Sequence, residues 1–139
     1  MDWGKYYSAR RILSAFPAAG AYDVYVEPMG GAAHVLMQKS PQHHVEIYND
    51  LNQDVVNCWM WLRDQPQELY ERLRSLPYSR ALYYRYHASL YDGSDLDSLE
   101  RAVRWFYVLR ASFSGWLARS PHGWKSSGMK NEALSYQNA

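Results

Sequence analysis

The sequence predicts a mixed α/β fold in which two short strands of a parallel sheet are followed by a series of helices. Residues 22–54 contain two runs rich in β-branched and aromatic residues, 22–27 and 45–48, on either side of the pair Gly30-Gly31. Later segments repeat apolar residues at helical spacing instead. With 139 residues, 47% of them hydrophobic, the chain can form one domain with a real core.

The composition argues against several classes of site. A single cysteine, Cys58, cannot form an internal disulfide, and no Cys/His cluster has metal-ligand spacing, so we expect a cytoplasmic protein without a structural metal. Cys58 has no neighbouring group in sequence that would lower its pKa, which predicts an unreactive thiol. Charged residues interrupt every apolar run, so we expect neither a signal peptide nor a membrane span.

The first strand is expected to end at Pro28 and to be largely buried, because Val24 and Val26 are β-branched and stand beside an aromatic residue. Gly30 and Gly31 allow a ligand to approach the backbone closely. They also allow a tight entry into a helix over residues 32–38, whose N-terminal N–H groups would face that ligand.

The second strand, residues 45–48, is followed by Asn49-Asp50. Asp50 lies 20 positions after Gly30, near the spacing at which an acidic residue binds ribose hydroxyls in nucleotide-binding βαβ units. The glycines do not form a G-x-G-x-x-G pattern, but the spacing predicts a cofactor that carries adenosine.

Helices are expected where apolar periodicity coincides with end signals. Pro66 suits a first helical position, Ser79 suits an N-cap, and Asp97 with Glu100 has capping-box spacing. The tyrosines of the segment after Ser79 are expected to pack in the core rather than to bind a ligand. From Ser112 onward the chain is punctuated by Gly, Ser and Pro and is expected to be irregular. The expected helices are residues 8–15, 53–63, 66–76, 80–90 and 96–111.

Basic charge is concentrated in residues 101–130. This segment has six Arg or Lys residues and no Asp or Glu, so it carries +6, which leaves −5 for the rest because the formal net charge is +1. Aromatic residues are interleaved with the basic ones, a mixture that suits phosphate contact and base stacking. A helix with an aromatic core-facing side and a solvated basic side explains the helical part equally well.

Several motifs resemble those of the Dam-type DNA adenine-N6 methyltransferases. Residues 27–31, EPMGG, are similar to the family's E-P-F-x-G-x-G turn, and residues 49–52, NDLN, to its N-D-x-N segment. Residues 3–5, WGK, stand where the family has G-G-K ahead of a helix, with one glycine replaced by Trp. Residues 77–80 and 110–115 resemble stretches of phage and prophage members.

The resemblance implies a partial Rossmann-like, S-adenosylmethionine-dependent methyltransferase fold with a mostly helical inserted target-recognition region. Residues 1–65 would form the cofactor-binding half, residues 66–130 the insert that contacts duplex DNA, and residues 131–139 the start of a truncated helix. The implied S-adenosylmethionine contacts are Trp3, Gly4, Lys5, Glu27, Pro28, Gly30, Gly31 and Asp50. The implied DNA contacts are Arg110, Ser112, Ser114, Gly115, Arg119 and Lys125.

The family's catalytic Asp-Pro-Pro-Tyr motif is absent, because no two prolines of this chain are adjacent. The resemblance therefore implies the N-terminal part of a site-specific DNA adenine-N6 methyltransferase, without catalytic residues of its own and inactive alone. Two strands are also an incomplete parallel sheet. We therefore expect either a second polypeptide that supplies the C-terminal half or self-association.

Two other functions stay open. The basic aromatic segment fits a non-catalytic DNA-binding or regulatory module derived from such an enzyme. The strand–turn–strand unit also fits the dinucleotide-binding domain of an oxidoreductase, although a third glycine is missing. The five histidines are scattered, and the pair His43-His44 is expected to be solvated rather than to bind a metal.

Overall fold

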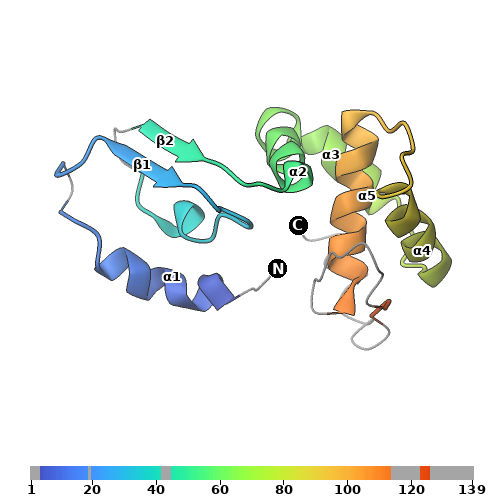
Figure 1. Cartoon of the computed structure of the whole chain (residues 1–139), viewed down its shortest axis with the longest axis horizontal. Helices are drawn as coiled ribbons and strands as arrows, with labels where there is room; N and C mark the ends of the chain where they lie inside the picture. The colour runs from blue at the N-terminus through green and yellow to red at the C-terminus, as the bar shows by residue number, and fades with distance from the viewer. Residues whose placement is uncertain (1–3, 19, 42–44, 114–122, 126–139) are drawn as a thin grey trace. The chain divides into compact units, whose positions relative to one another are not determined.

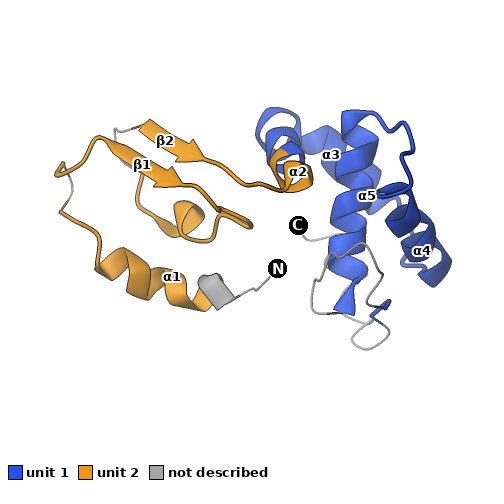
Figure 2. Cartoon of the chain, viewed as in Figure 1, with its two compact units in different colours: residues 1, 57–139 blue, residues 2–56 orange. Residues whose placement is uncertain are grey.

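Two compact units make up the structure, a computed structural model that describes residues 4–18, 20–41, 45–113 and 123–125 (Figure 2). One unit comprises residues 2–56 and the other residues 57–139, and for residues 4 and 5 only the backbone is described. The functional boundary expected after residue 65 stays a prediction. The elements (Figure 1) are α1 (Gly4–Ser14), β1 (Val24–Glu27), the 3-10 helix η1 (Leu36–Gln38), β2 (Val45–Tyr48), α2 (Gln53–Asp64), α3 (Pro66–Arg74), α4 (Arg80–Ser89) and α5 (Ser98–Ala111).

The strands β1 and β2 pair in parallel, as the sequence predicts. Successive side chains of a strand point to opposite faces, so residues that are paired in register share a face. The sheet therefore has one face with polar and aromatic side chains and one face with β-branched side chains only. The register pairs are Val24 with Val45, Tyr25 with Glu46, Val26 with Ile47, and Glu27 with Tyr48.

The polar and aromatic face of the sheet is covered within the same unit. The ring centroid of Tyr25 lies 5.5 Å from that of Phe16, which follows α1, and 5.4 Å from the Nζ atom of Lys39, which follows η1. The Lys39 side chain is buried and forms a 2.5 Å salt bridge with Glu46. An aromatic contact and an ion pair between buried Lys39 and exposed Glu46 therefore hold this layer on the sheet.

The β-branched face of the sheet is open. Val24, Val26, Val45 and Ile47 are between 46% and 59% exposed. The prediction of a largely buried strand is therefore wrong for this structure. The physical reason is that the layer containing Phe16 and Lys39 packs on the other face.

The segment after the glycine pair does not form the helix that the sequence predicts over residues 32–38. It consists of turns and the short 3-10 helix η1. Gly31 and Ala33 have φ angles of 52° and 51°, and this left-handed region is incompatible with a right-handed helix. The N–H of Ala33 donates to the carbonyl of Gly30 at 2.8 Å, which closes a tight turn. The expected ring of helix N-terminal N–H groups therefore does not form there.

The helices follow the predictions to within a few residues. α2 and α4 begin where predicted, and the N-cap at Ser79 is confirmed, since its hydroxyl accepts the N–H of Leu82 at 3.3 Å. α5 begins two residues later than predicted because Asp97 is its N-cap and accepts the N–H of Glu100 at 2.8 Å. α1 begins at Gly4 instead of residue 8, and α3 ends two residues early, at Arg74.

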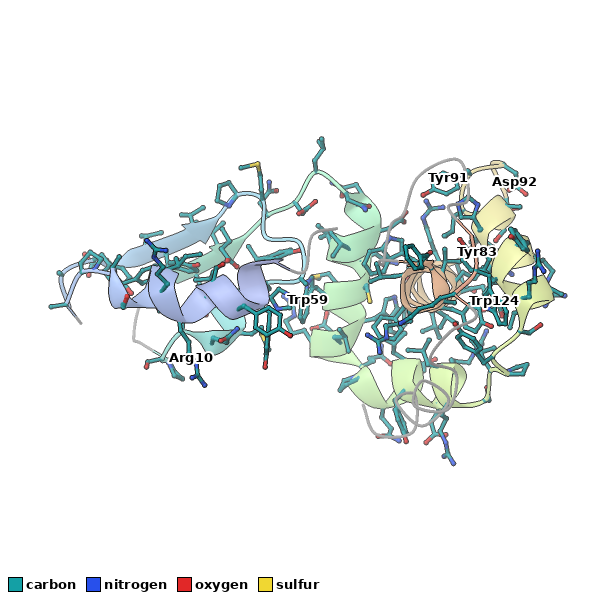
Figure 3. The ribbon with its side chains drawn as sticks, turned by 90° about the horizontal axis from the view of Figure 1, so that it is seen from below. Arg10, Trp59, Tyr83, Tyr91, Asp92 and Trp124 are labelled. Atoms are coloured by element: carbon teal, nitrogen blue, oxygen red, sulfur yellow. The ribbon has the colours of Figure 1, made fainter. Side chains whose placement is uncertain are left out.

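Aromatic side chains join α4 to α5. Tyr83 and Tyr107 have no exposed surface, and the ring centroids of Tyr86 and Tyr107 lie 5.4 Å apart. Tyr83 is directed at α5 (Figure 3), and its hydroxyl lies 3.4 Å from that of Ser112, at the end of this helix. The interpretation of the α4 tyrosines as core residues is confirmed for Tyr83 and Tyr86, whereas Tyr84 is exposed.

The hydroxyl of Tyr107 organises the connection between α3 and α4. It donates toward the carbonyls of Pro77 (2.9 Å) and Ser79 (3.2 Å) and accepts the N–H of Ser79 at 2.8 Å. Burial raises the pKa of this hydroxyl, so it stays protonated and able to donate. One buried side chain therefore satisfies several backbone groups of the turn.

Tyr107→Phe is expected to lower the free energy of unfolding by about 1–3 kcal/mol, because it leaves these backbone groups without their partner while the ring stays in place. Urea denaturation followed by circular dichroism measures the change. Tyr84→Phe is the matched control, since this α4 tyrosine is 39% exposed. Equal stability of the two variants would show that the Tyr107 hydroxyl does not hold the turn.

Candidate functional site

The turn that contains Gly30 and Gly31, here called the glycine turn, lies where both parallel strands end. The N–H of Gly30 donates to the carbonyl of Asn49, and the N–H of Asn49 donates to the carbonyl of Glu27, each at 2.9 Å. The Asn49 side chain adds a 3.0 Å bond to the carbonyl of Pro28. The strand pairing thus continues into the turn. Ligands of parallel sheets bind beyond the carboxyl ends of the strands, so this edge is the candidate cofactor site.

Asp50 faces the glycine turn. Its Oδ2 atom accepts the N–H of Gly31 at 2.8 Å, and its Oδ1 atom accepts the N–H of Asn52 at 2.9 Å. The structure therefore brings Asp50 and Gly31 together, as the spacing suggests. The carboxylate also braces the turn directly, a role that sequence reasoning missed. Its contact with a ribose stays a prediction.

The ring of Tyr48 leaves no room for a side chain at residue 30, which explains the glycine there. A Cβ atom added at Gly30 would lie 2.1 Å from Cε2 of the Tyr48 ring, a collision. The Tyr48 hydroxyl donates to the carbonyl of Gly31 at 2.6 Å. The missing side chain of Gly30 therefore makes room for Tyr48, whereas the sequence suggested room for a ligand. The sequence contained a signal for this contact, because Tyr48 is the last residue of the strand that precedes Asp50 and therefore lies at the same edge of the sheet as the turn.

Glu27 presents a carboxylate oxygen that has no hydrogen-bond partner in the described part of the chain. Its Oε2 atom is buried and has no hydrogen bond among the described residues. Tyr25 stands two residues earlier, and its pKa is raised to about 12, mainly by burial and then by the charge of Glu27 and a hydrogen bond to it. A buried, unsatisfied acceptor is unfavourable unless a donor reaches it. Glu27 is therefore suited to receive a cationic or N–H group of a ligand.

The start of α1 lies against the segment that follows the turn. The carbonyl of Tyr6 accepts the side-chain amide of Gln38 at 3.4 Å, and the Tyr6 ring packs edge-on against His34 at 5.5 Å between centroids. Gly4 is the first residue of α1. Trp3 and the side chain of Lys5 lie outside the described part of the chain, so their predicted contacts stay predictions.

An antiparallel bridge joins the end of α5 to residues 123–125, where the sequence predicts irregular structure. Ser112 pairs with Trp124, the N–H of Phe113 donates to the carbonyl of Gly123 at 3.2 Å, and the N–H of Lys125 donates to that of Ala111 at 2.8 Å. Two segments with predicted DNA contacts are thus adjacent in space.

The predicted DNA contacts differ in their surroundings. Arg110 lies in the last turn of α5, whereas Ser112 is buried and its hydroxyl donates to the carbonyl of Val108 at 2.7 Å. Ser114, Gly115 and Arg119 fall outside the described residues. The role of each in DNA binding stays a prediction.

Some basic residues of the segment 101–130 stabilise the unit of residues 57–139, here called the helical unit. Arg104 forms a 2.8 Å salt bridge with Glu100, and its guanidinium lies 5.0 Å from the ring centroid of Tyr86. Glu100 also pairs with Arg72 of α3. The side chain of Arg101 donates to the carbonyl of Leu90 at 3.5 Å. The charge of +6 in this segment therefore overstates what is available to a nucleic acid.

Other chemistries find little support in the described part of the chain. No group of three or more His, Cys, Asp or Glu side chains is placed there to hold a metal ion, and His43-His44 lies outside it. Cys58 is buried, and burial raises the pKa of its thiol to about 12, in agreement with an unreactive cysteine. Among these residues no helix is long and apolar enough to cross a membrane.

Comparison with known proteins supports the resemblance noted in the sequence. Residues 4–132 match the family described as D12 class N6 adenine-specific DNA methyltransferase. The chain is also 32% identical over 98 residues to the type II methyltransferase M1.LlaDCHI of Lactococcus lactis subsp. cremoris. That match covers 68% of this chain and 34% of the relative, so the chain spans about a third of the length of that protein. The chain belongs to the D12 class of N6 adenine-specific DNA methyltransferases.

Proposed function

We propose that this chain binds S-adenosylmethionine at the glycine turn and duplex DNA through its helical unit, as part of a site-specific DNA adenine-N6 methyltransferase. Family membership supports the class of reaction. The observation that carries the cofactor assignment is the convergence of Asp50 and Glu27 on the carboxyl end of the parallel strand pair. Such an edge binds nucleotide cofactors in open α/β sheets.

The donors and acceptors of the turn fit the parts of this cofactor. The free Oε2 atom of Glu27 suits the ammonium of the methionine moiety. Each oxygen of Asp50 accepts one backbone N–H and has a further lone pair for a ribose hydroxyl. Pro28 with the glycine pair would form the wall, and Lys5, which follows Gly4 at the start of α1, would add a cation for the methionine carboxylate. When bound, the cofactor supplies the electrophilic methyl group.

Asp50→Ala is expected to weaken S-adenosylmethionine binding by about 1–3 kcal/mol, because it removes a charged acceptor of ribose hydroxyls and the brace on Gly31. Isothermal titration calorimetry measures the affinity. Asp95→Ala, in the exposed loop before α5, is the control for loss of a negative charge. Unchanged affinity after Asp50→Ala would overturn the ribose assignment, and tighter binding of NAD than of S-adenosylmethionine would favour an oxidoreductase-type site.

The DNA-binding half of the proposal relies on the end of α5 and the bridge. Arg110 and Lys125 contribute positive charge from segments that the Ser112–Trp124 bridge makes adjacent. Phe113, beside the bridge, is 61% exposed and offers a ring for stacking. Cations with an exposed aromatic side chain suit a phosphate backbone and an unpaired base. Ser112 is buried and supports this proposed surface through the bridge, and the DNA contacts of Ser114, Gly115 and Arg119, which lie outside the described residues, stay predictions.

Arg110→Gln and Lys125→Gln are each expected to weaken binding to a duplex oligonucleotide and to reduce the slope of log affinity against log salt by about one. Fluorescence anisotropy at several salt concentrations measures both quantities. Arg63→Gln is the control, since this exposed arginine pairs with Asp64 on α2. Slopes unchanged in both test variants would remove this surface from the DNA interface. DNA binding by a chain that does not bind S-adenosylmethionine would favour the non-catalytic module.

The open face of the sheet supports a proposal about assembly. Val24, Val26, Val45 and Ile47 form a β-branched face without cover from the described residues of this unit. Parallel sheets are normally covered on both faces and have more strands. We infer that a polypeptide with the remaining part of the family's domain, including Asp-Pro-Pro-Tyr, covers this face. The matched relative is about three times as long as the segment that aligns with it.

The chain alone is expected not to transfer methyl groups to DNA, and addition of a polypeptide with the C-terminal part of a family member is expected to restore transfer. Val26→Lys should abolish this restoration, because it places a charge on the face to be covered. Leu51→Lys is the control, since Leu51 is 93% exposed and lies outside the strands. Tritium transfer from labelled S-adenosylmethionine is the readout. Activity of the isolated chain, or sedimentation as a dimer that Val26→Lys dissociates, would contradict the proposed partner.

A further inference from the structure

One residue of the glycine turn, Gly31, is held through both of its backbone polar groups. The N–H of Gly31 donates to Asp50 at 2.8 Å, and the carbonyl of Gly31 accepts the hydroxyl of Tyr48 at 2.6 Å. Both side chains come from the end of β2 and the residues directly after it. The two peptide units on either side of the Gly31 Cα atom are therefore held by side chains at the end of β2, although the turn itself follows β1.

This conformation needs a restraint. Gly31 and Ala33 both have φ angles in the left-handed region, and Ala33 has a side chain that disfavours it. The Tyr48 ring occupies the place of a side chain at Gly30, so it packs against the same turn that its hydroxyl holds. The ring restricts the turn by contact, and the hydroxyl restricts it by a directional bond.

We propose that Tyr48 is a positioning residue of the cofactor site, which acts through the carbonyl of Gly31 and not by contact with the cofactor. The inference rests on the proposed function, since it names how the same site is prepared. A turn that is ordered before binding does not have to be ordered by the ligand, and this raises affinity. Asp50 would then have two roles, as brace and as ligand contact, whereas Tyr48 has one.

The test is Tyr48→Phe, which keeps the ring and removes the hydroxyl. We expect an affinity for S-adenosylmethionine about three- to tenfold lower by calorimetry, in line with the loss of one hydrogen bond. We also expect faster hydrogen exchange at the Gly31 amide without cofactor. The matched control is Tyr78→Phe in the helical unit, where the lost hydroxyl likewise donates to a backbone carbonyl, that of Lys125, at 2.8 Å. This control should lower stability without a change in cofactor affinity.

The possible results separate the inference from the proposed function. If the unaltered chain binds S-adenosylmethionine and Tyr48→Phe binds it equally well, Tyr48 only packs and the inference is overturned. Equal loss of affinity in Tyr48→Phe and Tyr78→Phe would also overturn it, because both losses would then reflect general stability. If the unaltered chain does not bind S-adenosylmethionine, the proposed function fails, and the inference fails with it.

Discussion

The parallel pairing of β1 with β2 is the constraint on which the candidate cofactor site depends. Because the strands run in the same direction, their carboxyl ends meet at one edge, and residues separated by about 20 positions become neighbours there. The glycine turn takes three hydrogen-bond partners, Tyr48, Asn49 and Asp50, from the end of the neighbouring strand. An antiparallel arrangement of the same two segments would place Glu27 and Asp50 at opposite edges. No local feature of residues 27–31 could substitute for this pairing.

Sequence reasoning succeeded where the signal is local. The helix caps Ser79 and Asp97 lie within a few residues of the N–H groups that they satisfy, so their positions follow from short motifs. The prediction of a helix over residues 32–38 was wrong because the backbone of the preceding residue, Gly31, is held by Tyr48 and Asp50. These two residues lie 17 and 19 positions from Gly31 in the sequence. Propensity does not include such contacts. The prediction that the first strand is largely buried was wrong for a similar reason, since burial depends on which layers of the structure pack on each face of the sheet.

Charge and aromatic content in a sequence do not reveal which residues serve the fold. Arg104 lies over the ring of Tyr86 and pairs with Glu100, so its charge contributes to the helical unit. A guanidinium can serve packing and ion pairing at once, and this makes it a poor indicator of nucleic-acid binding when counted alone. The position of Arg110 in the last turn of α5 is more informative, because the adjacent bridge presents the exposed ring of Phe113. Of the six cations in residues 101–130, the structure thus assigns Arg101 and Arg104 to contacts within the helical unit.

In the proposed assembly, the two faces of the sheet would couple binding of the partner to binding of the cofactor. On one face the strands are held by Phe16 and by the pair of buried Lys39 with exposed Glu46, whose attraction is partly offset by the loss of hydration at Lys39. The other face contributes little, because its side chains are about half exposed. An isolated two-stranded sheet is marginal in water, so cover on the open face stabilises the strand ends as well as the strands. Since these ends carry Tyr48 and Glu27, a partner on the open face would order the cofactor edge without touching it. Cofactor binding would favour the partner by the same free energy, because such coupling is reciprocal.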